Sequence, residues 1–422
     1  MFQSIAVPSA YKLFKSSHDA IMTFDASQLR AALSDASRAT SVVTQLERLE
    51  LWLQIVADDA VLFEHAANTA QAPQVVLNAP LSVWQEACSL HPKPGYQSLG
   101  ALYRLCPEFS IQAQTIELMQ SLPTAELLLE AARHELHHVV EPLIHTDDLS
   151  QIKGEYLKTP QGWVYVESAG NPNNPSICML HTAGADSRQW HGLMSMPAIL
   201  EKWHMLAFDM PGHGRSTLPD QTANWQWKLT QNDYRQTVRD FIRQRFSQPV
   251  VLMGCSMGSA IGVTLLAKHP ELFRAAILLE TPYHSPGRRT PYLDHPKVHG
   301  ARLAATWVAS LLSPHSPLWR RKLATWIYSQ GAPSVYDGDL AFYSDEFRAN
   351  EHTASINTAV TPLWLLTGDY DYSASPTETK RVAAEIKGSV FQEMQGFGHF
   401  PMTEDPERLY QAYLKNVLSK LA

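Results

Sequence analysis

Apolar residues follow a helical spacing through most of the first 150 residues. In residues 25–67 they recur every three or four positions, and Asp25 and Ser27 are candidate helix N-caps. Residues 121–144 show the same spacing and end near Pro142. Because little of this half alternates with the period of a strand, the pattern predicts a mostly α-helical N-terminal domain over residues 1–150.

The pattern changes after residue 150, where short apolar runs alternate with helical stretches. Several runs are almost continuously apolar, which is typical of strands buried on both faces of a parallel sheet. The alternation predicts a doubly wound, mostly parallel α/β domain over residues 151–422. The predicted strands are Trp163–Glu167, Ile177–His181, Met205–Asp209, Val250–Gly254, Ala275–Glu280 and Leu363–Thr367.

Residues 281–360 interrupt this alternation. The segment is rich in Trp, Pro, His and Arg, and it predicts a helical cap insertion before the next strand. Such an insertion would lie above the carboxyl ends of the strands, where ligands bind in open α/β sheets. Its Trp and Tyr side chains could line a pocket for an apolar or aromatic acyl group.

The most informative stretch is a G-x-S-x-G pentapeptide, Gly254–Gly258, between an apolar strand and a helix. Glycines at both ends permit a sharp strand-to-helix turn that exposes the hydroxyl of Ser256. The helix N-terminus there favours developing negative charge, and the Met257 amide points toward it. The pattern predicts that Ser256 is a nucleophile.

A serine nucleophile needs a base, and the base needs an acid that orients it. In this architecture the chain order is serine, acid, histidine. Asp369 and Asp371 follow the strand at residues 363–367, and His399 lies in a glycine-bounded turn further on. His399 is therefore the predicted base, and either aspartate could be the acid.

These motifs together resemble an α/β-hydrolase-fold enzyme with a cap insertion, from about residue 153 to residue 422. "MLHTAGADSRQW" resembles the oxyanion loop of that family, "FDMPGHGRS" the loop after its fourth strand, and "GHFPMTEDPE" its catalytic-histidine loop. The resemblance implies that the acid is the third residue after Gly368, which selects Asp371 over Asp369. It also implies that the Ala183 amide joins Met257 in the oxyanion hole.

Two positions depart from or complicate the family pattern. Thr182 stands where the family commonly has glycine, which places a hydroxyl near the oxyanion. Glu280 ends the preceding strand, where some members of the family place their acid, so it remains a substitute candidate together with Asp369.

The string H-E-x-x-H at His134, Glu135 and His138 suggests a zinc peptidase helix. A site of that type needs a third ligand, and the extended motif fails because Glu141 and Ile144 stand where glycine and histidine belong. An exposed helical face is the expected structure. No metal and no cofactor is predicted.

The composition limits the class of protein further. With 45% hydrophobic and 18% charged residues, the 422-residue chain is typical of a globular protein, and its net charge of −7 argues against nucleic-acid partners and anionic membranes. The four cysteines show no disulfide-like spacing, and neither the N-terminus nor any apolar run suits a signal peptide or a membrane span. A cytoplasmic location is expected.

The predicted function is hydrolysis of a carboxylic ester, or of a thioester, lactone or amide, of a small apolar or aromatic molecule through an acyl-enzyme. Three alternatives stay open: a C–C bond hydrolase of a β-diketone-like metabolite, an acyltransferase, and a non-catalytic interaction protein. The N-terminal helical domain is a candidate surface for homo-oligomer formation.

Overall fold

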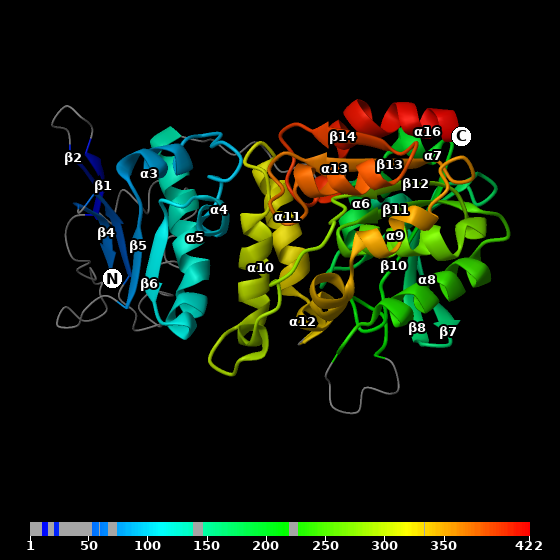
Figure 1. Ribbon diagram of the computed structural model, residues 1–422, viewed down its shortest axis with the longest axis horizontal. Coiled ribbons are helices and arrows are strands. Elements are labelled where there is room, and N and C mark those ends of the chain that lie inside the picture. Colours follow the sequence, from blue (N-terminus) through cyan, green and yellow to red (C-terminus); the bar gives the residue numbers. More distant parts are fainter. Residues whose placement is uncertain are drawn as a thin grey trace. The chain divides into compact units, whose positions relative to one another are not determined.

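The computed structural model describes residues 11–15, 21–24, 53–58, 60–65, 74–137, 147–218, 227–332 and 334–422 (Figure 1). The chain forms two compact units. The N-terminal unit holds Met1–Pro142 and His295–Ser310, and the large-sheet unit holds Leu143–Asp294 and Leu311–Ala422. The domain boundary at residue 150 stays a prediction.

The large-sheet unit is built on an eight-stranded sheet of order β14-β13-β12-β11-β9-β10-β8-β7. The pairs from β14 through β10 are parallel, and β8 and β7 complete the sheet in antiparallel pairs. The mostly parallel α/β sheet predicted from the sequence is therefore confirmed. The strands are β7 (Lys153–Thr159), β8 (Gly162–Ala169), β9 (Ser176–Leu180), β10 (His204–Phe208), β11 (Val250–Cys255), β12 (Phe273–Leu279), β13 (Leu363–Gly368) and β14 (Val390–Met394).

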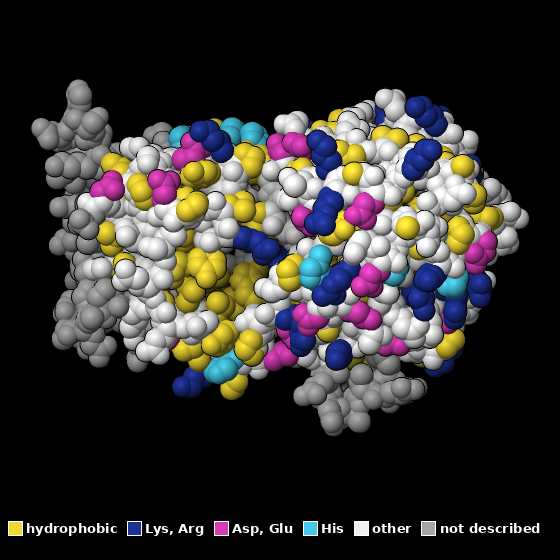
Figure 2. Space-filling model, in the orientation of Figure 1, with side chains coloured by type: hydrophobic (Ala, Val, Ile, Leu, Met, Phe, Trp, Pro, Cys, Tyr) yellow, Lys and Arg dark blue, Asp and Glu magenta, His cyan; other side chains and the backbone are white. Residues whose placement is uncertain are grey.

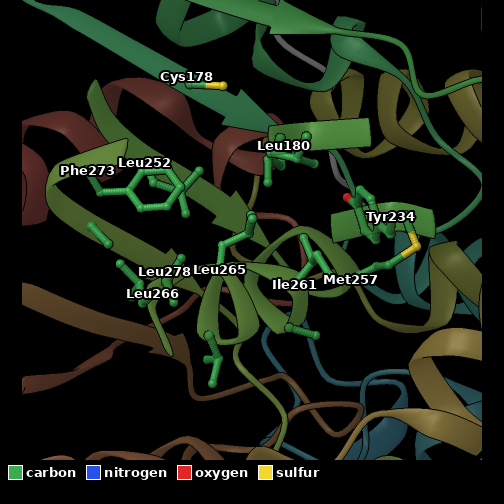
Figure 3. Close-up of a cluster of buried hydrophobic side chains, with 14 of the residues drawn as sticks. Cys178, Leu180, Tyr234, Leu252, Met257, Ile261, Leu265, Leu266, Phe273 and Leu278 are labelled. Carbon is green, nitrogen blue, oxygen red and sulfur yellow. The ribbon is translucent and has the colours of Figure 1, made fainter. Parts of the chain in front are cut away.

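Helices pack against this sheet and bury its apolar side chains. Helix α8 (Gln231–Arg245) contacts β7, α9 (Met257–Lys268) contacts β11 and β12, and α13 (Pro376–Glu385) contacts β13 and β14 (Figure 1). Side chains of α9 meet those of the central strands in one apolar cluster (Figure 3). Each fully buried Leu or Ile there contributes about 1.5–3 kcal/mol. This cluster fixes the start of α9, and with it the position of Ser256.

The segment between β12 and β13 is helical and is shared by both units. It contains α10 (Gly300–Ser310), α11 (Leu318–Ser329), α12 (Val335–Leu340) and a π-helical turn at Ala341–Glu346. Helix α10 belongs to the N-terminal unit, whereas the other three belong to the large-sheet unit.

In the N-terminal unit, the prediction of a mostly helical domain is not confirmed, and the expectation that this half holds few strands is wrong for the described residues. They form a four-stranded sheet of order β4-β3-β5-β6 together with α3, α4 and α5. The bounds are β3 (Leu53–Ala57), β4 (Ala60–His65), β5 (Val75–Asn78), α3 (Leu81–Ala87), α4 (Leu99–Leu105), β6 (Ser110–Ala113) and α5 (Thr115–His137). A further strand pair joins β1 (Tyr11–Lys15) to β2 (Ile21–Phe24).

The error has a local cause. In β3, Leu53, Ile55 and Ala57 are buried in strand alternation, but five residues of this kind are too short to be told from part of a helix by periodicity. The rest of the predicted helical region, residues 25–52, lies outside the described residues.

Helix α5 corresponds to the helix predicted over residues 121–144, but it begins earlier and contains Pro123 in its interior. It packs against α10, and Gln120 Nε2 donates a hydrogen bond of 2.8 Å to the carbonyl of Lys297. Buried Arg133 ties α5 to the carbonyls of Ala87 and Gln97 at 2.6 and 3.1 Å. In the part of the chain that the structure describes, no helix has the length and apolar character needed to cross a membrane.

Candidate active site

Ser256 lies at a sharp bend between β11 and α9. Its backbone has φ 54° and ψ −114°, a left-handed conformation that costs a non-glycine residue about 1–3 kcal/mol. A Cβ at Gly254 would lie 2.4 Å from the carbonyl oxygen of Gly258, and one at Gly258 would lie 2.5 Å from that of Leu180. The bend therefore requires both glycines of the pentapeptide.

The structure brings Ser256, His399 and Asp371 together. His399 Nε2 lies 2.8 Å from Ser256 Oγ, and His399 Nδ1 lies 2.6 Å from Asp371 Oδ2. Each of the three residues is 3% exposed. Because the Asp371 carboxylate accepts a hydrogen bond from Nδ1–H, Nε2 is left with a lone pair that faces the serine hydroxyl.

The environment of Asp371 keeps its side chain ionised. Burial alone would raise the pKa of this carboxyl, but the charge and hydrogen bond of His399, with further hydrogen bonds, lower it below its usual value. The other oxygen, Oδ1, accepts the backbone N–H groups of Ser373 and Ala374 at 2.6 and 3.1 Å. Both oxygens are thus held by donors.

The two substitute acids are placed differently. The Asp369 carboxylate accepts the backbone N–H of Gly396 at 2.8 Å, and burial raises its pKa. Glu280 lies beside Asp371, and its carboxyl group accepts the N–H of Gly368. Of the three candidates, Asp371 makes the hydrogen bond to His399.

In the loop after β9, the amides on both sides of Ala183 donate hydrogen bonds to side chains. The N–H and the hydroxyl of Thr182 both donate to Gln189 Oε1, each at 3.0 Å. The N–H of Gly184 donates to Asp339 Oδ2 at 2.7 Å. Within the described residues the Ala183 N–H between them has no acceptor.

Met257 is the first residue of α9, so its N–H has no acceptor within the helix. The Thr182 hydroxyl, expected near the oxyanion, is also hydrogen-bonded to the Tyr328 hydroxyl. Ala183 and Met257 are therefore the two amides that the sequence singled out and that the local hydrogen bonding leaves available.

His213 supports this loop. Its Nε2 lies 2.6 Å from Asp339 Oδ2, and its Nδ1 lies 3.0 Å from the carbonyl oxygen of Pro211. Burial would lower the pKa of His213, but the charge of Asp339 and these hydrogen bonds raise it. Asp339 also accepts Trp227 Nε1–H at 2.7 Å. Sequence reasoning missed Asp339, because nothing in its local sequence connects α12 with the loop after β9.

A row of aromatic side chains extends from His399. The ring of Phe400 lies 4.8 Å from that of His399 and 5.6 Å from that of Tyr328, which in turn lies 5.9 Å from Tyr336. The Tyr343 side chain comes from the π-helical turn, and its buried hydroxyl has no hydrogen-bond partner among the described residues. Burial raises the pKa of Tyr343 to about 12. The side chains of Ser256 and Ser373 act in the opposite direction and lower this pKa.

Cys255 is not a competing nucleophile. Its thiol is fully buried, points to the carbonyl oxygen of His399 at 3.4 Å, and burial raises its pKa well above the usual range. A thiol of this kind is inert because the thiolate is the reactive form.

The zinc hypothesis falls largely outside the described residues. The backbone of His134 and Glu135 continues α5, but His138 and the side chains of the first two are not described. Among the described side chains, Glu280, Asp371 and His399 are close enough together to hold a cation. The Nδ1–H of His399 and the N–H of Gly368 already occupy this cluster as donors.

Residues 175–406, more than half of the chain, match the alpha/beta hydrolase fold family. The chain belongs to this family. The expectation that the protein is a hydrolase of the alpha/beta family is confirmed.

Individual relatives are distant. The chain is 22% identical to the (E)-2-((N-methylformamido)methylene)succinate hydrolase of Acinetobacter baylyi over 56% of its own length and 88% of the relative. It is 25% identical to the uncharacterized hydrolase YraK of Bacillus subtilis, over 27% of this chain and 40% of YraK. The enol-lactonase of Burkholderia xenovorans LB400 superposes with a TM-score of 0.55 at 19% identity, covering 64% of this chain and 99% of that structure.

Proposed function

We propose that this protein is a serine hydrolase that cleaves a carboxylic ester, or a related thioester, lactone or amide, through a covalent acyl-enzyme. The observation that carries the proposal is the continuous hydrogen-bonded chain from Ser256 Oγ through His399 to Asp371, with lengths of 2.8 and 2.6 Å. Such a chain lets a neutral imidazole remove the hydroxyl proton as the oxygen attacks.

In the first half of the reaction, Ser256 Oγ attacks the carbonyl carbon while His399 Nε2 takes the hydroxyl proton. The imidazolium then gives this proton to the leaving group as the bond to the acyl carbon breaks. Water attacks the acyl-enzyme in the second half, with His399 as base and then as acid. Asp371 holds the imidazole orientation and stabilises its positive charge.

The N–H groups of Ala183 and Met257 receive the negative oxygen of the tetrahedral intermediates. Each preorganised donor of this kind is typically worth about 10²–10³ in kcat. The hydrogen bond from Gly184 to Asp339 supports the assignment, because it holds the peptide next to Ala183.

The substrate we propose is small and apolar or aromatic. Tyr328, Tyr336 and Phe400 present rings beside the site, and the Tyr343 hydroxyl is a donor without a partner in the described structure. Such walls favour an uncharged group with one hydrogen-bond acceptor.

The charges on the surface do not indicate a charged substrate. On the face drawn in Figure 2, acidic and basic side chains intermingle over the large-sheet unit. A charged substrate would find no broad field of one sign on this face. The aromatic side chains beside His399 therefore carry the substrate proposal.

The test is a panel of aromatic and aliphatic esters, thioesters and lactones assayed with the wild type and Ser256→Ala. We expect turnover of at least one aromatic ester in the wild type and its loss in the variant. Panel members with a β-diketone, and reactions with added alcohol or amine, separate C–C bond hydrolysis and acyl transfer from ester hydrolysis. Equal activity of both proteins would refute the proposal.

A further inference from the structure

Glu280 follows β12 in a conformation that glutamate rarely adopts. Its φ is +50°, and its side chain is fully buried. Left-handed backbone is a strained state for a residue with a Cβ, and it persists where the surrounding structure enforces it. The enforcing contacts are the Glu280 N–H to the Leu366 carbonyl at 2.9 Å and the Ser259 hydroxyl to the Glu280 carbonyl at 3.3 Å.

This conformation places the Glu280 carboxyl group against the acid of the proposed triad. One oxygen of Glu280, one oxygen of Asp371 and one ring nitrogen of His399 all lie within 4.8 Å of one another. The Gly368 N–H donates to the Glu280 carboxyl oxygens at 3.0 and 3.2 Å. Two carboxyl groups are thus buried next to one imidazole.

The charges around Glu280 disfavour a second anion. The titratable groups that face it are Asp371, His399, Glu404 and Cys255. Burial first, and then the negative charge of Asp371, raise the pKa of Glu280 well above its usual range. The pKa of Asp371 moves the other way, and a hydrogen bond from Glu280 contributes to this lowering.

We propose that Glu280 is a positioning residue that remains a neutral carboxylic acid and donates its O–H to the Asp371 carboxylate. The pair then holds one negative charge and one proton, and Glu280 fixes the orientation in which Asp371 faces His399. The inference rests on the proposed function. It gives the strained residue a role distinct from that of a substitute acid.

Two variants separate the parts of this proposal. Glu280→Gln keeps a donor at a similar size and cannot be charged, whereas Glu280→Leu fills similar space without a donor. The readout is the rate at which a fluorophosphonate probe labels Ser256 as a function of pH, which needs no known substrate. Intact-protein and peptide mass spectrometry identify the labelled residue.

If Glu280 is neutral, the Gln variant keeps the net charge of the site. Its labelling rate should then stay within about threefold of the wild-type rate, and the pH midpoint at which labelling falls off on the acid side should not move. The Leu variant loses the donor, so its labelling rate falls about 10- to 100-fold through misorientation of Asp371. An ionised Glu280 would instead make the Gln variant lose a negative charge beside the imidazole, and the acid midpoint would shift about one unit lower. That shift, or a Leu variant that labels like the wild type, would overturn the proposal.

A second measurement holds even if the Leu variant does not fold. The infrared difference spectrum between the wild type and Glu280→Gln at neutral pH should contain the band of one protonated carboxylic acid, and its absence would contradict the neutral state. A wild type that is not labelled at Ser256 would remove the proposed function and this inference together. Labelling of the wild type with unaltered variants would remove the inference alone.

Discussion

The imidazole of His213 and the carboxylate of Asp339 form a buried pair in which Nε2 and Oδ2 lie 2.6 Å apart. This pair joins the loop after β10 to α12. The same carboxylate accepts the N–H of Gly184, next to the proposed oxyanion donor Ala183. The pair therefore links the insertion between β12 and β13 to the loop that would receive the oxyanion.

Asp339→Ala is expected to destabilise the protein by about 3–5 kcal/mol, because removing one partner leaves the other charge buried and unpaired. Urea or guanidinium unfolding measures this free energy. In the double variant with His213→Gln the loss should be smaller than the sum of the two single losses. A change in the free energy of unfolding below about 1 kcal/mol in Asp339→Ala would show that the pair does not hold α12 to the loop after β10.

The contribution of His213 should depend on pH. Since its folded-state pKa is raised from its ordinary value of 6.5, the pair stabilises the fold fully below that ordinary value, and the stabilisation is lost as pH rises through the folded-state pKa. The stability difference between the wild type and His213→Gln should therefore shrink with increasing pH. Parallel unfolding curves at several pH values test this, and a difference that grows with pH would contradict it.

Asp371 and Asp369 offer a matched comparison two residues apart. Asp371→Asn should lower kcat by about 10⁴, because the histidine loses its orienting anion and adopts the wrong tautomer. Asp369→Asn should change kcat by less than about threefold, since its carboxylate binds the Gly396 N–H and not His399. Rates with one ester from the panel measure both, and the reverse order of effects would reassign the acid.

Tyr343→Phe removes a buried hydroxyl that has no described partner. If this hydroxyl binds the substrate, kcat/KM should fall about 10- to 100-fold, while stability should stay the same or rise, because an unpaired buried polar group is lost. Tyr234→Phe is the control, since the Tyr234 hydroxyl on α8 is also buried without a partner among the described residues. Equal activity of the two variants would show that the Tyr343 hydroxyl does not contact the substrate.

Helix α10 should stabilise the N-terminal unit, although in the sequence it lies between two strands of the large sheet, β12 and β13. Leu303 on α10 is fully buried, and the helix packs on α5 and α4. Leu303→Ala should therefore cost about 2–5 kcal/mol, measured as loss of hydrogen-exchange protection in α5. Arg302→Ala on the same helix, which changes an exposed side chain, should leave α5 protected.

Local sequence was sufficient to predict the geometry of the part of the proposed site that is built by consecutive residues. The bend at Ser256 lies between β11 and α9, which are consecutive in the chain. The loops with Asp371 and His399 follow strands whose apolar pattern is recognisable in the sequence. Asp339, Tyr343 and Gln189 were not found, because their positions near the site depend on how the insertion and the loop after β9 pack. The N-terminal sheet was missed because strands such as β3 and β5 have only five and four residues, too few for their periodicity to be told from that of a helix.

In the proposed reaction, the Ser256 oxygen becomes covalently bonded to the acyl group of the substrate. Rapid acid quench of the wild type during turnover of an activated aromatic ester, followed by peptide mass spectrometry, measures this directly. We expect an acyl adduct on Ser256 that forms in the first turnover and is absent from Ser256→Ala. Product formation with no adduct, or with the adduct on another residue such as Cys255, would contradict it.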